Sequence, residues 1–181
     1  MRNARRPCNA KTRGYTLIEV LIVVVVLGIA ASLVTPSMGG SGSLRVQAAV
    51  RTIVADITFA QSDSLAFQAG RALIFNPDEN EYTMVEVRSS TLDPEVDRVQ
   101  LTSFNHGKFG DARITRVAFS GDAGNLLIFD EMGAPVTAPL GSTPASNGFV
   151  EVEGSGQRFT LTVEGFTGRV SVAREDLTPA P

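Results

Sequence analysis

The chain of 181 residues has a net charge of −3, and that small value conceals an uneven distribution. Five basic residues and no acidic residue lie within the first 13 positions, whereas the residues after Glu19 carry 18 acidic and 11 basic side chains, a net charge of −7. An acidic soluble part argues against nucleic acid as a partner, since phosphate binding depends on clustered Lys and Arg. Cys8 is the only cysteine, which excludes an intrachain disulfide, and the length beyond the N-terminal segment fits a single domain.

An apolar segment from Tyr15 to Met38 follows the basic head and contains Glu19 as its only charged residue. At about 1.5 Å per residue, a helix of this length would cross a bilayer core roughly 30 Å thick. Three interpretations are open: a secretory signal peptide cleaved near Ala31, a plain single-span anchor with its basic end in the cytoplasm, and a segment in which Glu19 has a function. A carboxylate weakens a signal peptide and is an unexplained cost in a plain anchor, so the third interpretation is favoured.

The sequence Gly14-Tyr15-Thr16-Leu17-Ile18-Glu19, between a basic leader and an apolar helix, resembles the class III signal of type IV pilins and type II secretion pseudopilins. Tyr15 stands where Phe is more common in that signal. The resemblance implies that a prepilin peptidase cleaves after Gly14, methylates the new N-terminus at Tyr15, and leaves Glu19 for subunit assembly. The Glu19 carboxylate would pair with the Tyr15 ammonium of a neighbouring subunit, so that each buried charge has a partner. Residues 1–14 are then a cleaved leader, and residues 15–38 a transmembrane and filament-core helix.

The next part of the chain predicts a hinge and a second helix. Pro36 ends or kinks the first helix, and the glycine- and serine-rich residues 39–43 predict a flexible hinge in which Ser43 is a candidate N-cap. From Leu44 to Ala69, apolar residues at spacings of three and four predict an amphipathic helix that ends at Gly70 in a left-handed conformation. The apolar face of this helix consists of Val46, Val50, Ile53, Ile57, Ala60 and Ser64 or Leu65.

After Gly70 the hydrophobic period changes to two, which predicts strands. Residues 71–76 and 81–87 flank a hairpin turn at 77–80, and a polar loop follows at 89–97. Further strands are expected at 99–104, 112–119, 126–130, 148–153, 158–163 and 169–174, with a proline-rich loop without lasting regular structure before residue 148. Residues 44–181 are therefore expected to form a periplasmic domain of the α+β class, with an amphipathic helix packed on antiparallel β-sheets. One helix followed only by strands, with the segments LLIFDEMGAP and GFTGRVSV, resembles the H-type minor pseudopilins, the GspH/FimT family.

The residues after the apolar segment offer little catalytic or metal-binding chemistry. His106, the only histidine, is expected in a solvated turn, so nucleophile sets that need a histidine base are not favoured. Zinc, phosphate-loop and calcium-loop motifs are absent from the sequence. Asp78, Glu79 and Glu81 could hold calcium loosely, but a solvated hairpin tip is favoured. We therefore expect no enzyme activity, no cofactor and no metal site.

The favoured function is that of a minor pseudopilin in a type II secretion pseudopilus. Its expected location is the inner membrane, crossed once, with the C-terminal domain in the periplasm, and its expected partners are prepilin peptidase and other pilins. A minor pilin of a type IV pilus, used for adhesion, motility or DNA uptake, is the alternative within the same family. A binding domain tethered by one membrane helix is the alternative from a different class.

Overall fold

The computed structural model describes residues 14–34, 41–105, 107–119 and 124–177; the side chains of residues 32–34 and 41 are outside this description. The chain divides into two compact units, Met1–Gly39 and Gly40–Pro181. Most of the predicted leader, Cys8, Pro36 and His106 lie outside the described residues.

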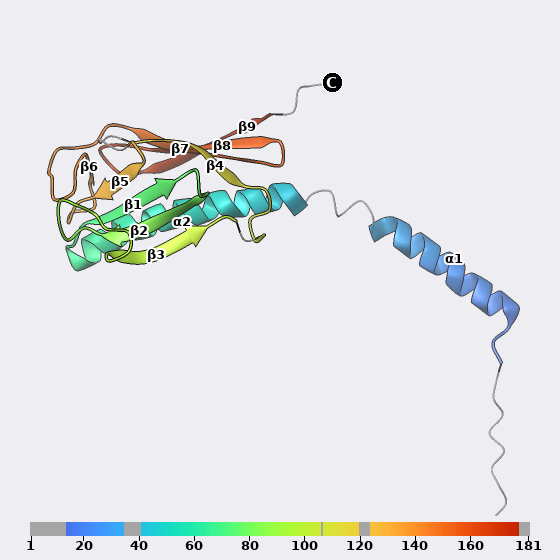
Figure 1. Cartoon of the computed structure of the whole chain (residues 1–181). Coiled ribbons are helices and arrows are strands. Elements are labelled where there is room, and N and C mark those ends of the chain that lie inside the picture. Colours follow the sequence, from blue (N-terminus) through green and yellow to red (C-terminus); the bar gives the residue numbers. More distant parts are fainter. Residues whose placement is uncertain (1–13, 35–40, 106, 120–123, 178–181) are drawn as a thin grey trace, which may run out of the picture. The chain divides into compact units, whose positions relative to one another are not determined.

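In the first unit, Leu17–Val34 form helix α1 (Figure 1). Glu19 is its only charged residue and lies in the first turn. The rest of the helix is almost wholly aliphatic, with four consecutive valines from Val23 to Val26. No helix in the described part of the chain is both long enough and apolar enough to cross a membrane.

In the second unit, helix α2 runs from Ser41 to Phe67 and begins earlier than predicted. Residues 41–43 form its first turn, so that part of the predicted hinge is wrong, as is the assignment of Ser43 as N-cap; residues 39 and 40 lie outside the described residues. The Ser43 hydroxyl donates to Gln157 Oε1 at 3.1 Å and accepts from Gln47 Nε2 at 3.3 Å. Serine and glycine are weak helix formers, so these side-chain contacts outweigh the local preference.

The C-terminal end of α2 is also built differently from the prediction. The left-handed residue is Gln68, with φ 49°, and not Gly70. The Ala69 amide donates to the Ser64 carbonyl at 3.2 Å, which completes a Schellman-type end. Gly70 is required for a different reason, because a Cβ at this position would lie 3.0 Å from the Val87 Cβ. The predicted cap at Gly70 is therefore wrong, and close packing explains the glycine.

In the described part of the second unit, nine strands form two antiparallel sheets (Figure 1). The first sheet has the order β3-β2-β1-β5-β6 and the second the order β4-β7-β8-β9. The eight predicted strands are confirmed. The structure adds a ninth strand, β6, which lies in the predicted proline-rich loop and pairs with β5. The bounds are β1 Arg71–Asn76, β2 Glu81–Glu86, β3 Arg98–Ser103, β4 Arg113–Ala118, β5 Leu126–Phe129, β6 Pro135–Val136, β7 Gly148–Gly154, β8 Gln157–Val163 and β9 Val170–Asp176.

The main core lies between α2 and the inner faces of both sheets. The predicted apolar face of α2 is buried, with Ser64 rather than Leu65 as its last position, and Ala49 belongs to it as well. The strands contribute inward residues at every second position, among them Leu73, Phe75, Tyr82, Met84, Val150, Val152, Phe159 and Leu161. A smaller cluster on the other face of the first sheet contains Ala72, Val85, Val87, Ile128 and Val136. The predicted α+β fold is confirmed.

Asn80 joins the two sheets. It lies in the turn between β1 and β2 in a left-handed conformation, φ 54°, and is only 9% exposed. Its Nδ2 donates to the Ala112 carbonyl at 3.0 Å, and its Oδ1 accepts from the Ile114 amide, the second residue of β4, at 2.9 Å. The Asn80 carbonyl also accepts from the Phe104 amide at 3.0 Å. The sequence predicts a solvated turn at residues 77–80, but Asn80, the last residue of this turn, is buried.

Candidate functional site

The residues predicted to carry function lie together at the start of α1. Gly14 and Tyr15 precede the helix, and no atom lies within 4 Å of the position that a Cβ of Gly14 would take. The Tyr15 side chain is 83% exposed. An exposed backbone with open space around it is what the cleft of a peptidase needs.

Thr16 is the N-cap of α1. Its Oγ1 accepts from the Glu19 amide at 3.3 Å, and its carbonyl accepts from the Glu19 and Val20 amides at 3.1 and 3.2 Å. Thr-x-x-Glu is the pattern of a capping box, and a carboxylate in the first turn also faces the positive end of the helix dipole. The sequence predictions do not include Thr16, although this four-residue pattern is visible in the sequence.

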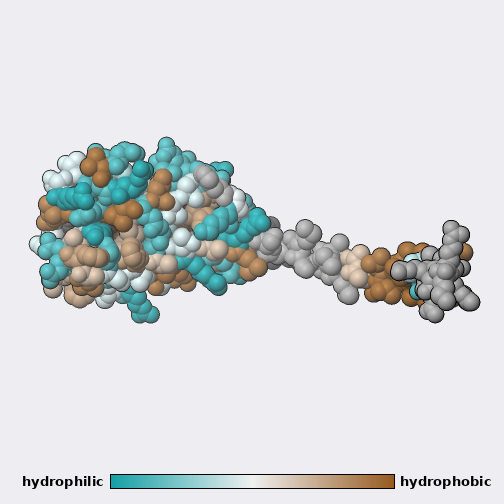
Figure 2. Space-filling model, turned by 90° about the horizontal axis from the view of Figure 1, so that it is seen from below, coloured by the Kyte–Doolittle hydropathy of each residue, from teal (hydrophilic) through white to brown (hydrophobic). Residues whose placement is uncertain are grey.

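Every side chain described in α1, from Leu17 to Ala31, is exposed. Eleven of them are large and apolar, and this part of the molecule is brown in Figure 2. Glu19 is exposed too, and none of the described cations forms an ion pair with it. An exposed apolar surface of this kind marks a site of contact with other proteins or with a membrane.

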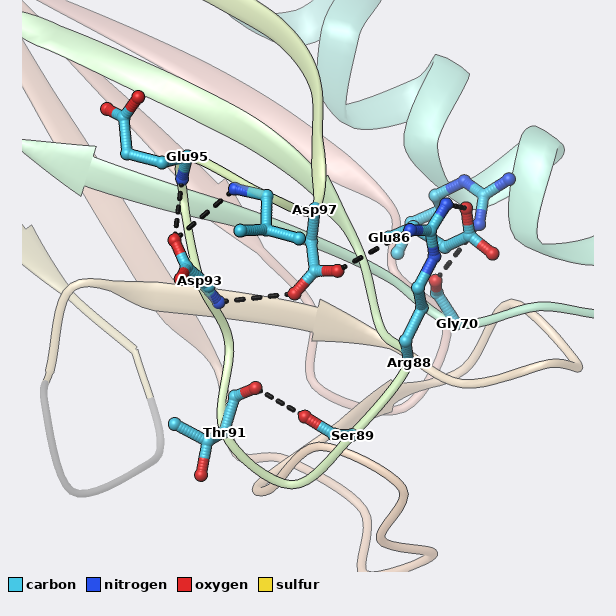
Figure 3. A network of polar contacts seen from close by, with 10 residues as sticks. Gly70, Glu86, Arg88, Ser89, Thr91, Asp93, Glu95 and Asp97 are labelled. Atoms are coloured by element: carbon cyan, nitrogen blue, oxygen red, sulfur yellow. Dashed lines mark hydrogen bonds and ion pairs between the residues drawn. The ribbon is translucent and has the colours of Figure 1, made fainter.

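The acidic loop between β2 and β3 is stabilised by its own backbone and by Arg88 (Figure 3). Asp93 Oδ1 accepts from the Glu95 amide at 2.8 Å, and the Asp93 amide donates to Asp97 Oδ2 at 3.3 Å. Arg88 pairs with Glu86 at 3.0 Å and with Asp97 at 3.8 Å. Within the residues that the structure describes, no group of three or more His, Cys, Asp and Glu side chains is arranged to hold a metal ion.

The acidic turn between β1 and β2 is likewise engaged in local contacts. Asn76 Nδ2 donates to Glu79 Oε2 at 3.1 Å, and Asn76 Oδ1 accepts from the Glu79 amide at 3.3 Å. Partial burial, followed by the nearby negative charge of Glu79, raises the pKa of Glu81. Asp78 and its neighbours thus form a hydrogen-bonded turn.

A buried phenol connects α2 to the first sheet. The Tyr82 hydroxyl donates to Asp56 Oδ2 at 2.6 Å, and Gln100 Nε2 donates to the same oxygen at 3.1 Å. Burial, and then the Asp56 carboxylate, raise the pKa of the Tyr82 hydroxyl above its usual value. Because the partners come from α2, β2 and β3, this contact fixes the position of α2 on the sheet.

Comparison with known proteins gives one family motif and two similar structures. Residues 9–35 match the prokaryotic N-terminal methylation motif. The minor pseudopilin EpsH from the Type 2 Secretion System of Vibrio cholerae is similar with a TM-score of 0.50 and 7% identity, over 71% of this chain and 96% of that one. The type IV minor pilin FimU of Pseudomonas aeruginosa, strain PAO1, is similar with a TM-score of 0.51 and 13% identity, over 71% of this chain and 87% of that one. No curated protein sequence matches the chain.

An N-terminal methylation motif is thus followed by a helix-and-two-sheet domain with a pilin-like fold. More particularly, this domain has the fold shared by a minor pseudopilin and a minor pilin. The resemblance to type IV pilins and type II pseudopilins inferred from Gly14–Glu19 is confirmed at this level. The H-type subfamily and the roles of Gly14, Tyr15 and Glu19 stay predictions.

Proposed function

We propose that the chain is a minor pseudopilin of a type II secretion pseudopilus, of the H-type, processed by prepilin peptidase and assembled by packing of its N-terminal helix against those of other pilins. The observation that carries this proposal is the match of residues 9–35 to the methylation motif, directly at a helix whose described side chains are all exposed. The similarity to EpsH supports the same fold for the domain behind it. The proposed role is structural and not catalytic.

In this proposal the peptidase cleaves after Gly14 and Tyr15 becomes the methylated N-terminus. Intact-mass and peptide mass spectrometry of the mature chain test it, since the first residue should be N-methylated Tyr15. Gly14→Val should retain the leader, because a branched side chain would enter the peptidase cleft at the cleavage point. Gly28→Val is the matched control: the space around its Cβ position is also open, but it lies inside α1, so processing should be normal. An intact leader in the wild type, or cleavage near Ala31, would contradict the proposal.

Glu19 is proposed to pair with the Tyr15 ammonium of a neighbouring subunit. Glu19→Ala should leave cleavage largely intact and impair incorporation into filaments, measured in a sheared-filament fraction. Because Thr16 caps α1 through the Glu19 amide, Thr16→Val separates helix capping from the intersubunit charge pair. It removes the cap and keeps the carboxylate, so incorporation should stay closer to that of the wild type than with Glu19→Ala. Equal losses in the two variants would assign Glu19 to helix capping alone, and normal incorporation of Glu19→Ala would refute its role in assembly.

The proposed location is the inner membrane, crossed once by the segment 15–38, with residues 44–181 in the periplasm. Five basic residues ahead of the segment support a cytoplasmic N-terminus. The acidic balance of the remaining chain supports partners other than nucleic acid. Protease treatment of spheroplasts tests this orientation: the C-terminal domain should be digested from outside, and full protection in intact spheroplasts would contradict it.

A minor pilin of a type IV pilus is the second candidate, supported by the similarity to FimU, whose TM-score of 0.51 is close to the 0.50 of EpsH. Deletion of the gene distinguishes the two filaments. Loss of an exported protein from the medium with normal surface pili supports the secretion pseudopilus, whereas loss of pili with normal export supports the type IV pilus. A tethered binding domain predicts an unmethylated N-terminus, so the mass spectrometry above also tests that alternative.

A further inference from the structure

A groove of about 490 Å³ lies between α2 and β9. Its lining is mainly apolar, with Val54 from α2, Phe159 from β8 and Val172 from β9, and it also includes Arg51 and Arg174. β9 is the last strand of its sheet, so the groove opens beside a strand edge that pairs with no other described strand. We call this surface the α2–β9 groove.

The groove carries positive charge. Arg51 is exposed and forms no ion pair with any described residue, whereas Arg174 pairs with Asp176 at 2.8 Å. Val172 is 47% exposed, so part of the apolar lining is accessible from solvent. A partner that fits this groove has an apolar side chain next to a carboxylate.

A surface with an apolar side chain next to a carboxylate lies on the same chain, at the C-terminal end of α2. Gln61 Nε2 donates to the Gly133 carbonyl at 2.8 Å and to the Thr167 carbonyl at 2.9 Å, which holds the turn after β5 beside the turn after β8. Each turn presents a large apolar side chain: Met132 is 79% exposed and Phe166 is 83% exposed.

Hydrogen bonds hold the backbone of the turn after β5, which carries Met132. Asp130 Oδ1 accepts from the Met132 amide at 2.9 Å and from the Ala134 amide at 2.8 Å, and the Gly133 amide donates to the Asp130 carbonyl at 3.0 Å. Glu131, directly before Met132, is exposed. We call residues 130–133 the tip turn. It therefore combines an exposed apolar side chain with an adjacent carboxylate on a hydrogen-bonded scaffold.

We propose that the tip turn of one copy of this chain docks in the α2–β9 groove of a second copy, with Met132 on the apolar lining beside Val172 and Glu131 near Arg51. The charges are opposite, and the two surfaces belong to different parts of α2: Arg51 and Val54 lie in its first half, and Gln61 lies near its end. A contact between two different surfaces of one chain leaves the second surface of each copy available, so it can repeat head to tail from copy to copy.

This contact goes beyond the proposed function, which concerns the packing of the N-terminal helices. A single turn in a shallow groove gives a small interface, so the contact is expected to be weak between free domains. Anchoring two copies in one membrane or filament raises their effective concentration and makes a weak contact populated. The test therefore uses the full chain in the membrane.

The experiment is site-directed crosslinking between two copies that carry different epitope tags, both with Cys8→Ser. One copy carries Met132→Cys and the other Val172→Cys, and a short bis-maleimide is added to membranes. Val99→Cys replaces Val172→Cys as the matched control, because Val99 is also an exposed strand valine, 47% exposed, but lies on β3 away from the groove. Leader removal, measured on the same samples, reports separately on the proposed processing.

The expected result is a crosslinked pair of differently tagged chains for Met132→Cys with Val172→Cys, in a yield at least about fivefold that of the Val99→Cys control. Arg51→Glu in the Val172→Cys copy should lower that yield about fivefold, and Glu131→Arg in the other copy should restore it, since opposite charges then face each other again. Equal yields with Val172→Cys and Val99→Cys would overturn the proposal, as would crosslinking of Met132→Cys only to a different protein. Processing can be normal in either case, so this result is independent of the proposed function.

Discussion

Replacement of Asn80 by alanine should destabilise the domain by about 3–4 kcal/mol. The change removes both side-chain hydrogen bonds and leaves the buried Ile114 amide without its acceptor, which costs about 1–3 kcal/mol. The residue also has φ 54°, and alanine in the left-handed region costs about 1 kcal/mol more than asparagine. The bond to the Ala112 carbonyl accounts for the remainder.

Urea unfolding of the full chain in detergent, followed by far-ultraviolet circular dichroism, measures this free energy. Asn80→Gly is the companion variant: it loses the same two side-chain bonds but tolerates the positive φ, so it should be about 1 kcal/mol more stable than Asn80→Ala. A loss below about 1 kcal/mol in Asn80→Ala would refute the claim that this side chain joins the sheets. Full stability in Asn80→Gly would show that only the backbone conformation matters.

Two further changes test local features of the domain. Gly168→Ala should lower the free energy of unfolding by about 1–3 kcal/mol, because φ is +71° and the new Cβ would lie 2.5 Å from Gln61 Nε2. Gly124→Ala is the matched variant, because Gly124 has φ +66° but open space around its Cβ position. It should lose only the part of the stability that comes from the unfavourable backbone conformation. Urea midpoints of both variants check this, and equal losses would contradict the steric part of the reasoning. Hydrogen bonds from the Ser155 amide and hydroxyl lower the pKa of Asp111, so its contribution to stability is present above about pH 4 and is lost as the pH falls through the lowered pKa. Asp111→Asn should therefore be less stable than the wild type at pH 7 and differ least from it near pH 2, as measured by thermal unfolding across that range; a difference independent of pH would contradict the assignment.

The helix and strands of the domain could be predicted because their burial repeats locally. Spacings of three and four along α2, and of two along strands such as β7 and β8, give the inward side chains directly, and the structure buries them. The ends of α2 could not be predicted in this way. Its start depends on Gln157, more than a hundred residues away, and its left-handed end residue is Gln68, where glycine at position 70 was the stronger local signal.

The division of the strands into two sheets also depends on distant contacts. β1 pairs with β2 beside it in sequence but also with β5, and β4 pairs with β7, so the order of the strands is set by pairings that no local pattern specifies. The role of Asn80 belongs to the same category, since its partners lie more than thirty residues further along the chain. β6 is two residues long and begins with a proline, which local preference assigns to a loop.

The candidate site was accessible from sequence because its signal is short and continuous. Gly14, Tyr15 and Glu19 lie within six adjacent positions, and the matched motif spans them. Thr16 lies between them and has the capping role that the Thr-x-x-Glu pattern favours. The α2–β9 groove is the opposite case, because its residues come from three elements that only the fold brings together.

The exposed apolar surface of α1 makes transfer of this helix into water costly. Its eleven large apolar side chains, each worth about 1.5–3 kcal/mol on transfer out of water, represent a free energy of roughly 20 kcal/mol, more than the 5–15 kcal/mol that typically stabilises a whole domain. Release of the helix into water on the way from one location to another would therefore be prohibitively slow. For the proposed assembly into a filament, the path from the membrane would therefore have to keep α1 in apolar surroundings at every step.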